Sequence, residues 1–232
     1  MSEISDDVIK SLIRKMFEKQ NELNIHTNGS DWKTNKDLKW NRAILIECAE
    51  LIGHTDWKWW KKDDISLKDI EMEVIDIWHF AMSNMMTITT IDNCVENTFY
   101  AFKNFETIIF DLETVRYRTE VLIYNCSRDF KFHLDPFVKL CSVLNMNVDS
   151  IYKLYMGKNI LNKFRQDNGY KEKTYIKMWD DKEDNFYLMK YLDRVIEIGD
   201  DFEEELYNFL QETYKKEIYR NLQETYKKNI PN

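Results

Sequence analysis

The sequence predicts an all-α protein, a multi-helix globular domain with a central helix bundle. Only 5 of its 232 residues are glycine and 2 are proline, so it has few of the residues that tight turns between β-strands require. Apolar residues make up 44% of the chain and recur at helical spacing along much of it. Charged residues at 32% complete the composition of an ordinary globular protein.

Helical periodicity predicts three helices in the first half of the chain, over residues 5–25, 40–54 and 66–90. Ser5 and the two acids after it are suited to cap the first of them. The third is so strongly apolar that we expect it to be a buried central element. Polar residues with Asn28-Gly29 predict a loop over 26–39, and the tryptophan-rich tract 56–64 predicts a turn or short helix.

The second half also reads as helical. We expect one or two helices over 92–130 and a pair over 134–161, with no linker rich in proline, glycine or serine between them. The heptapeptide LQETYKK occurs twice, at 210–216 and 222–228. These features predict a main domain over residues 1–207 and a solvated helical tail over 208–232, for which a role in assembly stays open.

Charge and cysteine content exclude several classes of protein. A net charge of −8 argues against broad binding to nucleic acid. The four cysteines lie far apart without C-x-x-C spacing, which favours free thiols in a reducing compartment. The beginning MSEISDDVIK has no cationic start or apolar core, and no run of about 18 apolar residues occurs. We therefore expect a cytoplasmic protein that does not engage a membrane.

Two pairs of acids stand inside apolar stretches. They are Glu47 and Glu50 in AILIECAELIG, and Glu73 and Asp76 in IEMEVIDIWHF. Residues three apart share one face of a helix, so antiparallel packing of the two helices would bring four carboxylates together. Without partners these groups would repel one another and lose hydration, so the pattern predicts that Mg²⁺ or Mn²⁺ neutralises them. In that case the central bundle carries a metal site.

Two alternatives concern the same acids. They could face solvent or pair with lysine and arginine on neighbouring helices, as isolated acid pairs usually do. Di-iron four-helix proteins are disfavoured, because they use Glu-x-x-His pairs and neither acid pair here has histidine at the fourth position. His79 follows Asp76 by three and is more typical of a structural residue.

Two segments are rich in cations and aromatic rings. WKWWKK at 57–62 could provide an aromatic wall for a base and cations for phosphate, or be a packing or membrane-surface element. The segment 158–179 carries six lysines and arginines among amides and aromatics, which could equally be a solvated face. Because no glycine-rich phosphate loop occurs, any phosphate would be held by metal and side chains. The two segments would then supply what a triphosphate needs beside an acidic metal site.

Together these motifs resemble the dimeric, all-α dUTPases. ECAELIGHTDWKWWKK resembles the family's first metal motif with its W-K-W-W-K segment, and EVIDIWHF resembles the second metal motif. KNILNKFRQDNGYKEKTYIKMWDDKEDN is similar to the family's C-terminal motif. The family commonly has glycine where Lys173 and Asp181 stand, so the closing geometry of that loop is an open question.

The resemblance implies a Mg²⁺-dependent enzyme that converts dUTP, and also dUDP, to dUMP, releasing pyrophosphate from dUTP. It implies that Glu47, Glu50, Glu73 and Asp76 bind the metal and that Glu47, or else Glu50, is the general base on the attacking water. It implies that Gln20 and Asn24 recognise uracil, that Trp60 packs on this base, and that Phe80 lies against deoxyribose. Phosphate contacts or closure of the site fall to Lys61, Lys158, Asn162, Arg165, Lys171 and Asn185, with Lys177 a weaker candidate. It also implies a homodimer.

Two other functions stay open. A related all-α pyrophosphatase could act on dCTP or on several nucleoside triphosphates, since the acid pairs are shared by that whole superfamily, whereas the WKWWK and FRQDNGYK segments favour dUTPase. In a non-enzymatic helical assembly protein, the terminal repeat would mediate assembly and the carboxylates would form ordinary ion pairs. Removing residues 208–232 separates the two classes, because an enzyme is expected to keep some catalysis without them.

Overall fold

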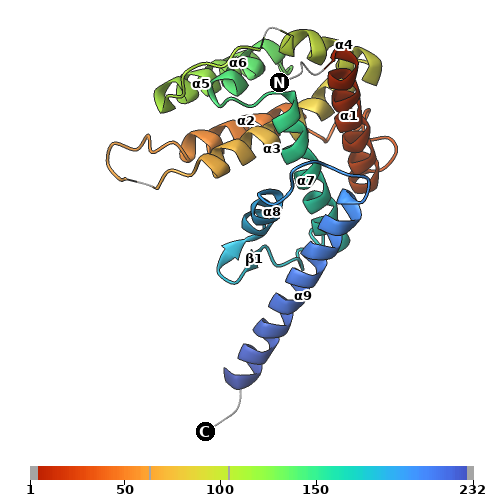
Figure 1. Ribbon diagram of the computed structural model, residues 1–232, viewed down its shortest axis with the longest axis vertical. Coiled ribbons are helices and arrows are strands. Elements are labelled where there is room, and N and C mark those ends of the chain that lie inside the picture. The colour runs from red at the N-terminus through yellow and green to blue at the C-terminus, as the bar shows by residue number, and fades with distance from the viewer. Residues whose placement is uncertain (1–4, 63, 104, 229–232) are drawn as a thin grey trace. The chain divides into compact units, whose positions relative to one another are not determined.

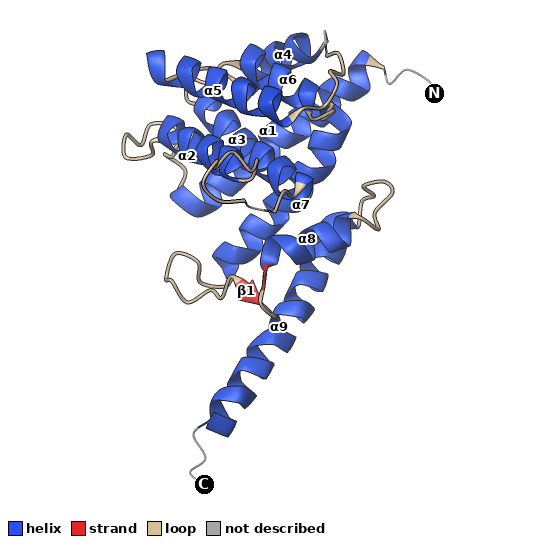
Figure 2. Ribbon diagram, turned by 90° about the vertical axis from the view of Figure 1, so that its left-hand side faces the viewer, coloured by secondary structure: helices blue, strands red, loops and turns tan. Residues whose placement is uncertain are grey.

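The computed structural model describes residues 5–62, 64–103 and 105–228, with side chains up to residue 220. It is all-α, as the sequence predicts, and forms two compact units that divide between Tyr155 and Met156 (Figures 1 and 2). None of the described helices is both long and apolar enough to cross a membrane.

In the described part of the N-terminal unit there are six helices and the beginning of a seventh. They are α1 (Asp6–Asn28), α2 (Trp40–Gly53), α3 (Leu67–Met86), α4 (Ile91–Phe102), α5 (Leu112–Asp129), α6 (Leu134–Val143) and α7 (Val148–Asp167). Ser5 caps α1 and accepts a hydrogen bond from the backbone N–H of Val8, while Ser66 caps α3 and accepts one from that of Asp69. The three helices predicted in the first half therefore form close to their predicted bounds, and the segment 92–130 divides into two helices.

Helix α3 is the centre of this unit. It packs against α1, α2 and α4 (Figure 1). Nearly every side chain from Val74 to Met86 is buried. Burying an aliphatic or aromatic side chain contributes about 1.5–3 kcal/mol, so this helix supplies a large share of the unit's hydrophobic stabilisation. The expectation of a buried central helix is confirmed. Its burial gives rigid support to any polar group that α3 carries.

The C-terminal unit consists of the end of α7, a short antiparallel hairpin of β1 (Met178–Trp179) and β2 (Lys182–Glu183), α8 (Asp184–Leu192) and α9 (Phe202–Lys228). Gly157 on α7 allows close packing, since a Cβ there would lie 2.9 Å from a methyl group of Leu192. Along α9, Leu206, Leu210 and Tyr214 are buried. The predicted division at residue 207 falls inside α9, and the first copy of LQETYKK contributes to the core and is not solvated on all sides.

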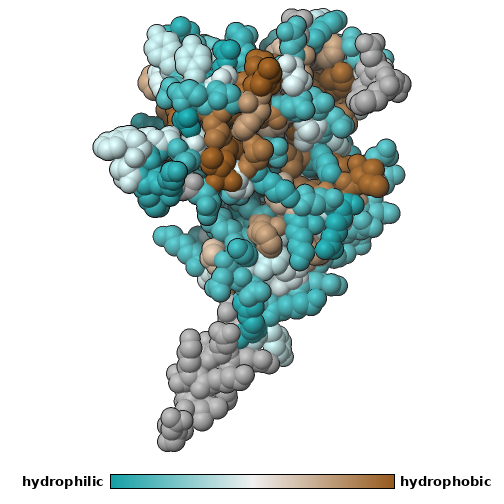
Figure 3. Space-filling view, turned by 60° about the vertical axis from the view of Figure 1, so that its left-hand side comes forward, coloured by the Kyte–Doolittle hydropathy of each residue, from teal (hydrophilic) through white to brown (hydrophobic). Residues whose placement is uncertain are grey.

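Apolar side chains also reach the surface. Figure 3 shows a band of them between polar areas on one face. Among the exposed ones in the N-terminal unit are Ile46 on α2, Tyr117 and Tyr124 on α5, and Ile109 in the connection before α5. Exposed apolar area of this kind is typical of surfaces that contact another protein or a ligand.

Candidate functional site

Helices α2 and α3 bring three acidic side chains together. Trp40 at the start of α2 contacts Phe80 in the second half of α3, with ring centroids 6.2 Å apart. Glu47 lies further along α2 and approaches Glu73, which is nearer the start of α3, so the two helices run antiparallel. One carboxylate oxygen from each of Glu47, Glu73 and Asp76 lies within 4.8 Å of the other two. Three of the four carboxylates that the sequence singled out therefore converge.

The acidic trio, Glu47, Glu73 and Asp76, suits a divalent cation. All three side chains are half-buried, and carboxylate oxygens are the ligands that Mg²⁺ and Mn²⁺ prefer. Mg²⁺ binds oxygen at about 2.0–2.1 Å, so two oxygens on one ion lie at most about 4 Å apart. The observed spacing of up to 4.8 Å needs only a small side-chain adjustment to meet that limit. Within the described residues this is the only group of three or more acidic, histidine or cysteine ligand atoms at such spacing.

The surroundings of the acidic trio are polar on one side. Glu50 follows Glu47 by one helical turn, but its side chain is exposed and lies outside the trio. His54, just after α2, brings its Nε2 to 3.5 Å from Oε1 of Glu73. Phe80 lies one turn beyond Asp76 on α3, so an apolar ring borders the carboxylates along the same helix face.

Gln20 and Asn24, the residues assigned to uracil by resemblance, lie in a buried polar network of the N-terminal unit. The Gln20 amide donates to Asn24 Oδ1 at 3.1 Å and to Ser83 Oγ at 3.2 Å. Its carbonyl oxygen lies 2.7 Å from His79 Nδ1 and accepts a hydrogen bond from the Tyr155 hydroxyl at 3.2 Å. All five side chains are buried, so the network fixes which end of the Gln20 amide points toward Asn24.

The segment between α2 and α3 carries Trp60 and Lys61. It extends away from the helices as an open loop (Figure 1). Its first residues are held in place because Arg116 donates to the backbone carbonyl of Thr55 at 2.7 Å. Beyond that anchor Trp60 is 57% exposed and meets the edges of Trp57 and Trp59 with centroids 5.3 and 5.2 Å away. An exposed aromatic cluster on a loop is free to cover a ligand, whereas a core tryptophan is not.

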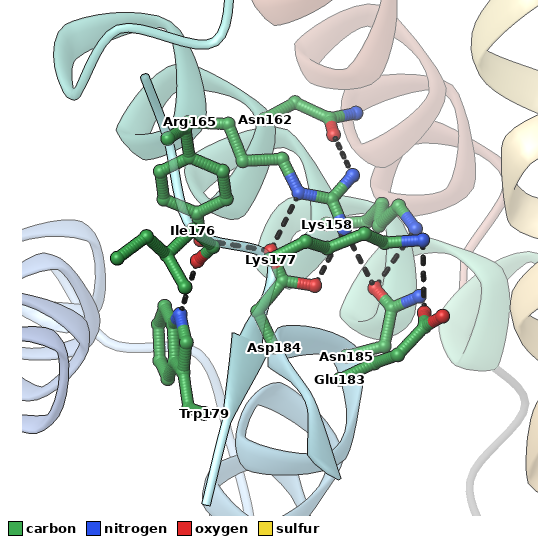
Figure 4. Close-up of polar contacts among 10 residues, drawn as sticks. Lys158, Asn162, Arg165, Ile176, Lys177, Trp179, Glu183, Asp184 and Asn185 are labelled. Carbon is green, nitrogen blue, oxygen red and sulfur yellow. Dashed lines mark hydrogen bonds and ion pairs between the residues drawn. The ribbon is translucent and has the colours of Figure 1, made fainter. Parts of the chain in front are cut away.

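A second polar cluster lies in the C-terminal unit. Lys158, Asn162 and Arg165 follow one face of α7, and Asn185 faces them from the start of α8 (Figure 4). Asn185 Oδ1 accepts from Lys158 Nζ at 3.0 Å, and Asn162 Oδ1 accepts from Arg165 Nη1 at 3.1 Å. Four of the residues assigned to phosphate by resemblance are therefore neighbours, and we call them the basic cluster.

Asp184 holds this basic cluster in place. It is fully buried, and its two oxygens accept from Nε and Nη2 of Arg165 at 2.8 and 2.7 Å, with a third hydrogen bond from the Tyr175 hydroxyl at 2.8 Å. Burial alone would raise the pKa of Asp184, but the hydrogen bonds and charge of Arg165 and the Tyr175 hydrogen bond outweigh it and lower that pKa. The carboxylate is thus charged at neutral pH and orients the guanidinium (Figure 4).

Two further lysines of this segment were predicted to contact phosphate or to close the site. Lys171 is exposed in the loop after α7, and Lys177 forms a surface ion pair with Glu183 at 2.9 Å. Lys173 and Asp181 stand where the dimeric dUTPases commonly have glycine, and they adopt φ angles of 59° and 57°. The loop therefore keeps the left-handed backbone that glycine favours, although both residues carry a Cβ.

A sequence model of the dUTPase family matches residues 12–170, which is more than half of the chain. The chain belongs to the all-α dUTPase family. No curated protein matches it. The match includes the acidic trio and most of the basic cluster, and it ends before the hairpin, α8 and α9. Family membership supports dUTP diphosphatase activity and a small nucleotide as substrate.

The sequence analysis overlooked several residues that shape the Gln20 network and the basic cluster of this dUTPase. Ser83 and Tyr155 complete the network around Gln20, and Asp184 and Tyr175 orient Arg165. Asp184 was hidden among acids in DDKED, a run that resembles a solvated turn. Its position at the start of a helix, α8, in an aromatic-rich segment could have indicated a buried acid, because a carboxylate can be buried there when it pairs with a cation.

Proposed function

We propose that this dUTPase is a Mg²⁺-dependent enzyme that hydrolyses dUTP, and also dUDP, to dUMP, releasing pyrophosphate from dUTP. The observation that carries the proposal is the convergence of Glu47, Glu73 and Asp76 on the antiparallel pair α2 and α3. These residues would hold the cation, with Mn²⁺ as a substitute and Glu50 as a further ligand. A bound cation supplies positive charge against the phosphates and makes a nearby water more acidic.

The proton of the attacking water goes to a carboxylate. Glu47 is our choice of general base, because its carboxylate is half-buried and belongs to the acidic trio. Glu50 is the alternative, and its exposed side chain is free to reorient. Both lie on the same face of α2, so a water bound between this face and the phosphates is within reach of either.

Base recognition falls to the buried amides and the aromatic residues. Uracil offers a hydrogen-bond acceptor where cytosine offers a donor, and a fixed amide rejects the wrong partner because a buried group is then left unpaired. Gln20 and Asn24 supply such amides, held by His79, Ser83 and Tyr155. Trp60 would cover the base from its exposed loop, and Phe80 would contact deoxyribose where a 2′-hydroxyl would clash.

Phosphate binding falls to the cations. Lys158 and Arg165 in the basic cluster, with the amides of Asn162 and Asn185, give a fixed set of donors for a polyphosphate chain. The resemblance assigns the same role to Lys61 and Lys171, whose side chains are exposed. Positive charges that are already in position before the reaction stabilise the transition state of phosphoryl transfer.

Product analysis tests the reaction. With dUTP the proposal expects dUMP and pyrophosphate without free orthophosphate, and with dUDP it expects dUMP and orthophosphate. Release of orthophosphate from dUTP with formation of dUDP would contradict it, because the bond between the wrong two phosphates would then be cleaved. Comparable turnover of dCTP would favour the related broad-specificity pyrophosphatase.

We also propose that the enzyme is a cytoplasmic homodimer. The resemblance to the dimeric dUTPases supports the homodimer, and the band of exposed apolar side chains in Figure 3 is suited to contact with a second copy. The four cysteines are free and buried, which fits a reducing compartment. Light scattering during size-exclusion chromatography measures the mass directly, and a value equal to the 28.3 kDa chain would contradict the homodimer.

A further inference from the structure

Helix α9 contacts the loop that leads from the basic cluster to α8. Tyr214 in the first LQETYKK copy is buried and stacks on Tyr175, with ring centroids 5.1 Å apart and planes 29° apart. It also packs against Phe164 and Trp179, each with its centroid 5.5 Å away. Figure 2 shows the hairpin strand beside α9. The tyrosine of one repeat is therefore part of the core of the C-terminal unit.

Two polar contacts join α9 to the same loop. The Tyr214 hydroxyl accepts a hydrogen bond from the backbone N–H of Ile176 at 3.2 Å, and Arg220 pairs with Asp180 and with the buried Glu217. These contacts fall on either side of Trp179, whose indole donates to the carbonyl of Ile176 at 2.8 Å. Helix α9 thus holds the loop at the backbone of Ile176 and at the side chain of Asp180, and the Trp179 hydrogen bond links these two parts of the loop.

This loop needs outside support. Lys173, Asp180 and Asp181 all have φ angles between 49° and 59°, a backbone conformation that side chains with a Cβ disfavour by about 1–2 kcal/mol each. Strained residues persist when the surrounding structure over-determines them. Contacts from α9 provide such restraint, because they hold Ile176, Trp179 and Asp180 of this loop.

A chain of contacts joins Tyr214 to the basic cluster. Tyr214 stacks on Tyr175, the Tyr175 hydroxyl donates to Asp184, and Asp184 orients the guanidinium of Arg165. A change at Tyr214 is therefore expected to alter the position of Arg165, three contacts away along this chain. This makes Tyr214 a positioning residue.

We propose that the first copy of LQETYKK positions the phosphate-binding residues of this enzyme through Tyr214. The proposal rests on the proposed function for its consequence in catalysis. It concerns a segment outside the 12–170 match to the dUTPase family.

Helix α9 provides a control. Tyr219 lies on the same helix and is 71% exposed, so Tyr214→Ala and Tyr219→Ala are compared in the full chain, together with Tyr214→Phe. The first readout needs no activity: it is the rate of trypsin cleavage after Lys171, Lys173 and Lys177 in the loop. The second is the KM for dUTP measured alongside kcat.

Tyr214→Ala is expected to speed cleavage in the loop and to raise the KM for dUTP, each by about tenfold, as removal of a buried aromatic contact predicts. Tyr214→Phe keeps the stacking and should recover most of both losses, whereas Tyr219→Ala should resemble the unaltered protein. Equal effects of Tyr214→Ala and Tyr219→Ala, or an unchanged cleavage rate in Tyr214→Ala, would overturn the proposal. An enzyme inactive on dUTP would overturn the proposed function, while the cleavage rates would still decide the positioning role.

Discussion

Arg165 and Asp184 form a two-point ion pair in which Asp184 is fully buried and the Arg165 side chain is 11% exposed. Arg165 belongs to the basic segment 158–179, whereas Asp184 lies beyond it. The arginine pairs with this acid, and the acid accepts a hydrogen bond from the Tyr175 hydroxyl. The pair therefore holds the guanidinium in one orientation, so that little rearrangement is needed when a phosphate binds.

Asp184→Asn should destabilise the C-terminal unit by about 3–5 kcal/mol, because it leaves the Arg165 charge buried without its partner. Denaturant unfolding followed by tryptophan fluorescence measures the change. The control is Glu183→Gln, which removes the neighbouring exposed ion pair with Lys177 and should cost at most about 1 kcal/mol. Equal losses in the two variants would contradict the structural role given to Asp184.

Asp76→Asn and Glu47→Gln should each abolish turnover and weaken Mn²⁺ binding while leaving the helical circular dichroism unchanged. The reason is that each removes one anionic ligand from a group of three. Glu71→Gln is the matched control, since Glu71 lies on α3 between the two metal motifs and outside the acidic trio. Normal activity in either of the first two variants would remove the basis for the metal site.

Lys173→Gly and Asp181→Gly should each stabilise the loop by up to about 1 kcal/mol, because glycine adopts a positive φ without a steric penalty. Glycine in the unfolded chain offsets part of this gain. Glu172→Gly, at an exposed neighbouring position that has no positive φ, should not stabilise it. Thermal unfolding of the three variants gives the comparison, and a lower Tm in both of the first two would show that the left-handed backbone is not a source of strain.

The thiols should make the protein sensitive to alkaline pH. Burial raises the pKa of Cys94 and of Cys126 to about 11, and it raises those of Cys48 and Cys141 further. The folded protein thus keeps protons that the unfolded chain loses near pH 8.5, so the free energy of unfolding should fall as the pH rises above that value. Thiol titration at pH 8 should detect no reactive cysteine before unfolding and four afterwards, and prompt reaction of the folded protein would contradict this burial.

The sequence predicted the N-terminal half well, because its signals are local. Apolar spacing and the caps Ser5 and Ser66 place α1 and α3, and the acid pairs on α2 and α3 converge once those two helices pack antiparallel. The sequence could not show that Glu50 turns to solvent, since a spacing of three residues gives a shared face but not its burial. The burial of Glu50 depends on how neighbouring helices pack.

The C-terminal half was harder to predict, because its order comes from contacts between distant segments. Tyr214 meets Tyr175 across a separation of 39 positions in a repeat whose charge pattern indicates a solvated helix. The buried role of Asp184 likewise depends on Arg165 on another helix. One consequence is that deleting residues 208–232 removes core side chains, Leu210 and Tyr214, and is not a neutral test of the tail.

The central claim is tested most directly by the release of pyrophosphate from dUTP, UTP, dTTP and dCTP, each measured with Mg²⁺ and with EDTA. The proposed function predicts fast release from dUTP alone, lost in EDTA and restored by Mg²⁺. Equal turnover of several nucleotides would contradict the assignment to dUTP. Absence of release from all four would contradict enzymatic activity itself and favour the helical assembly protein.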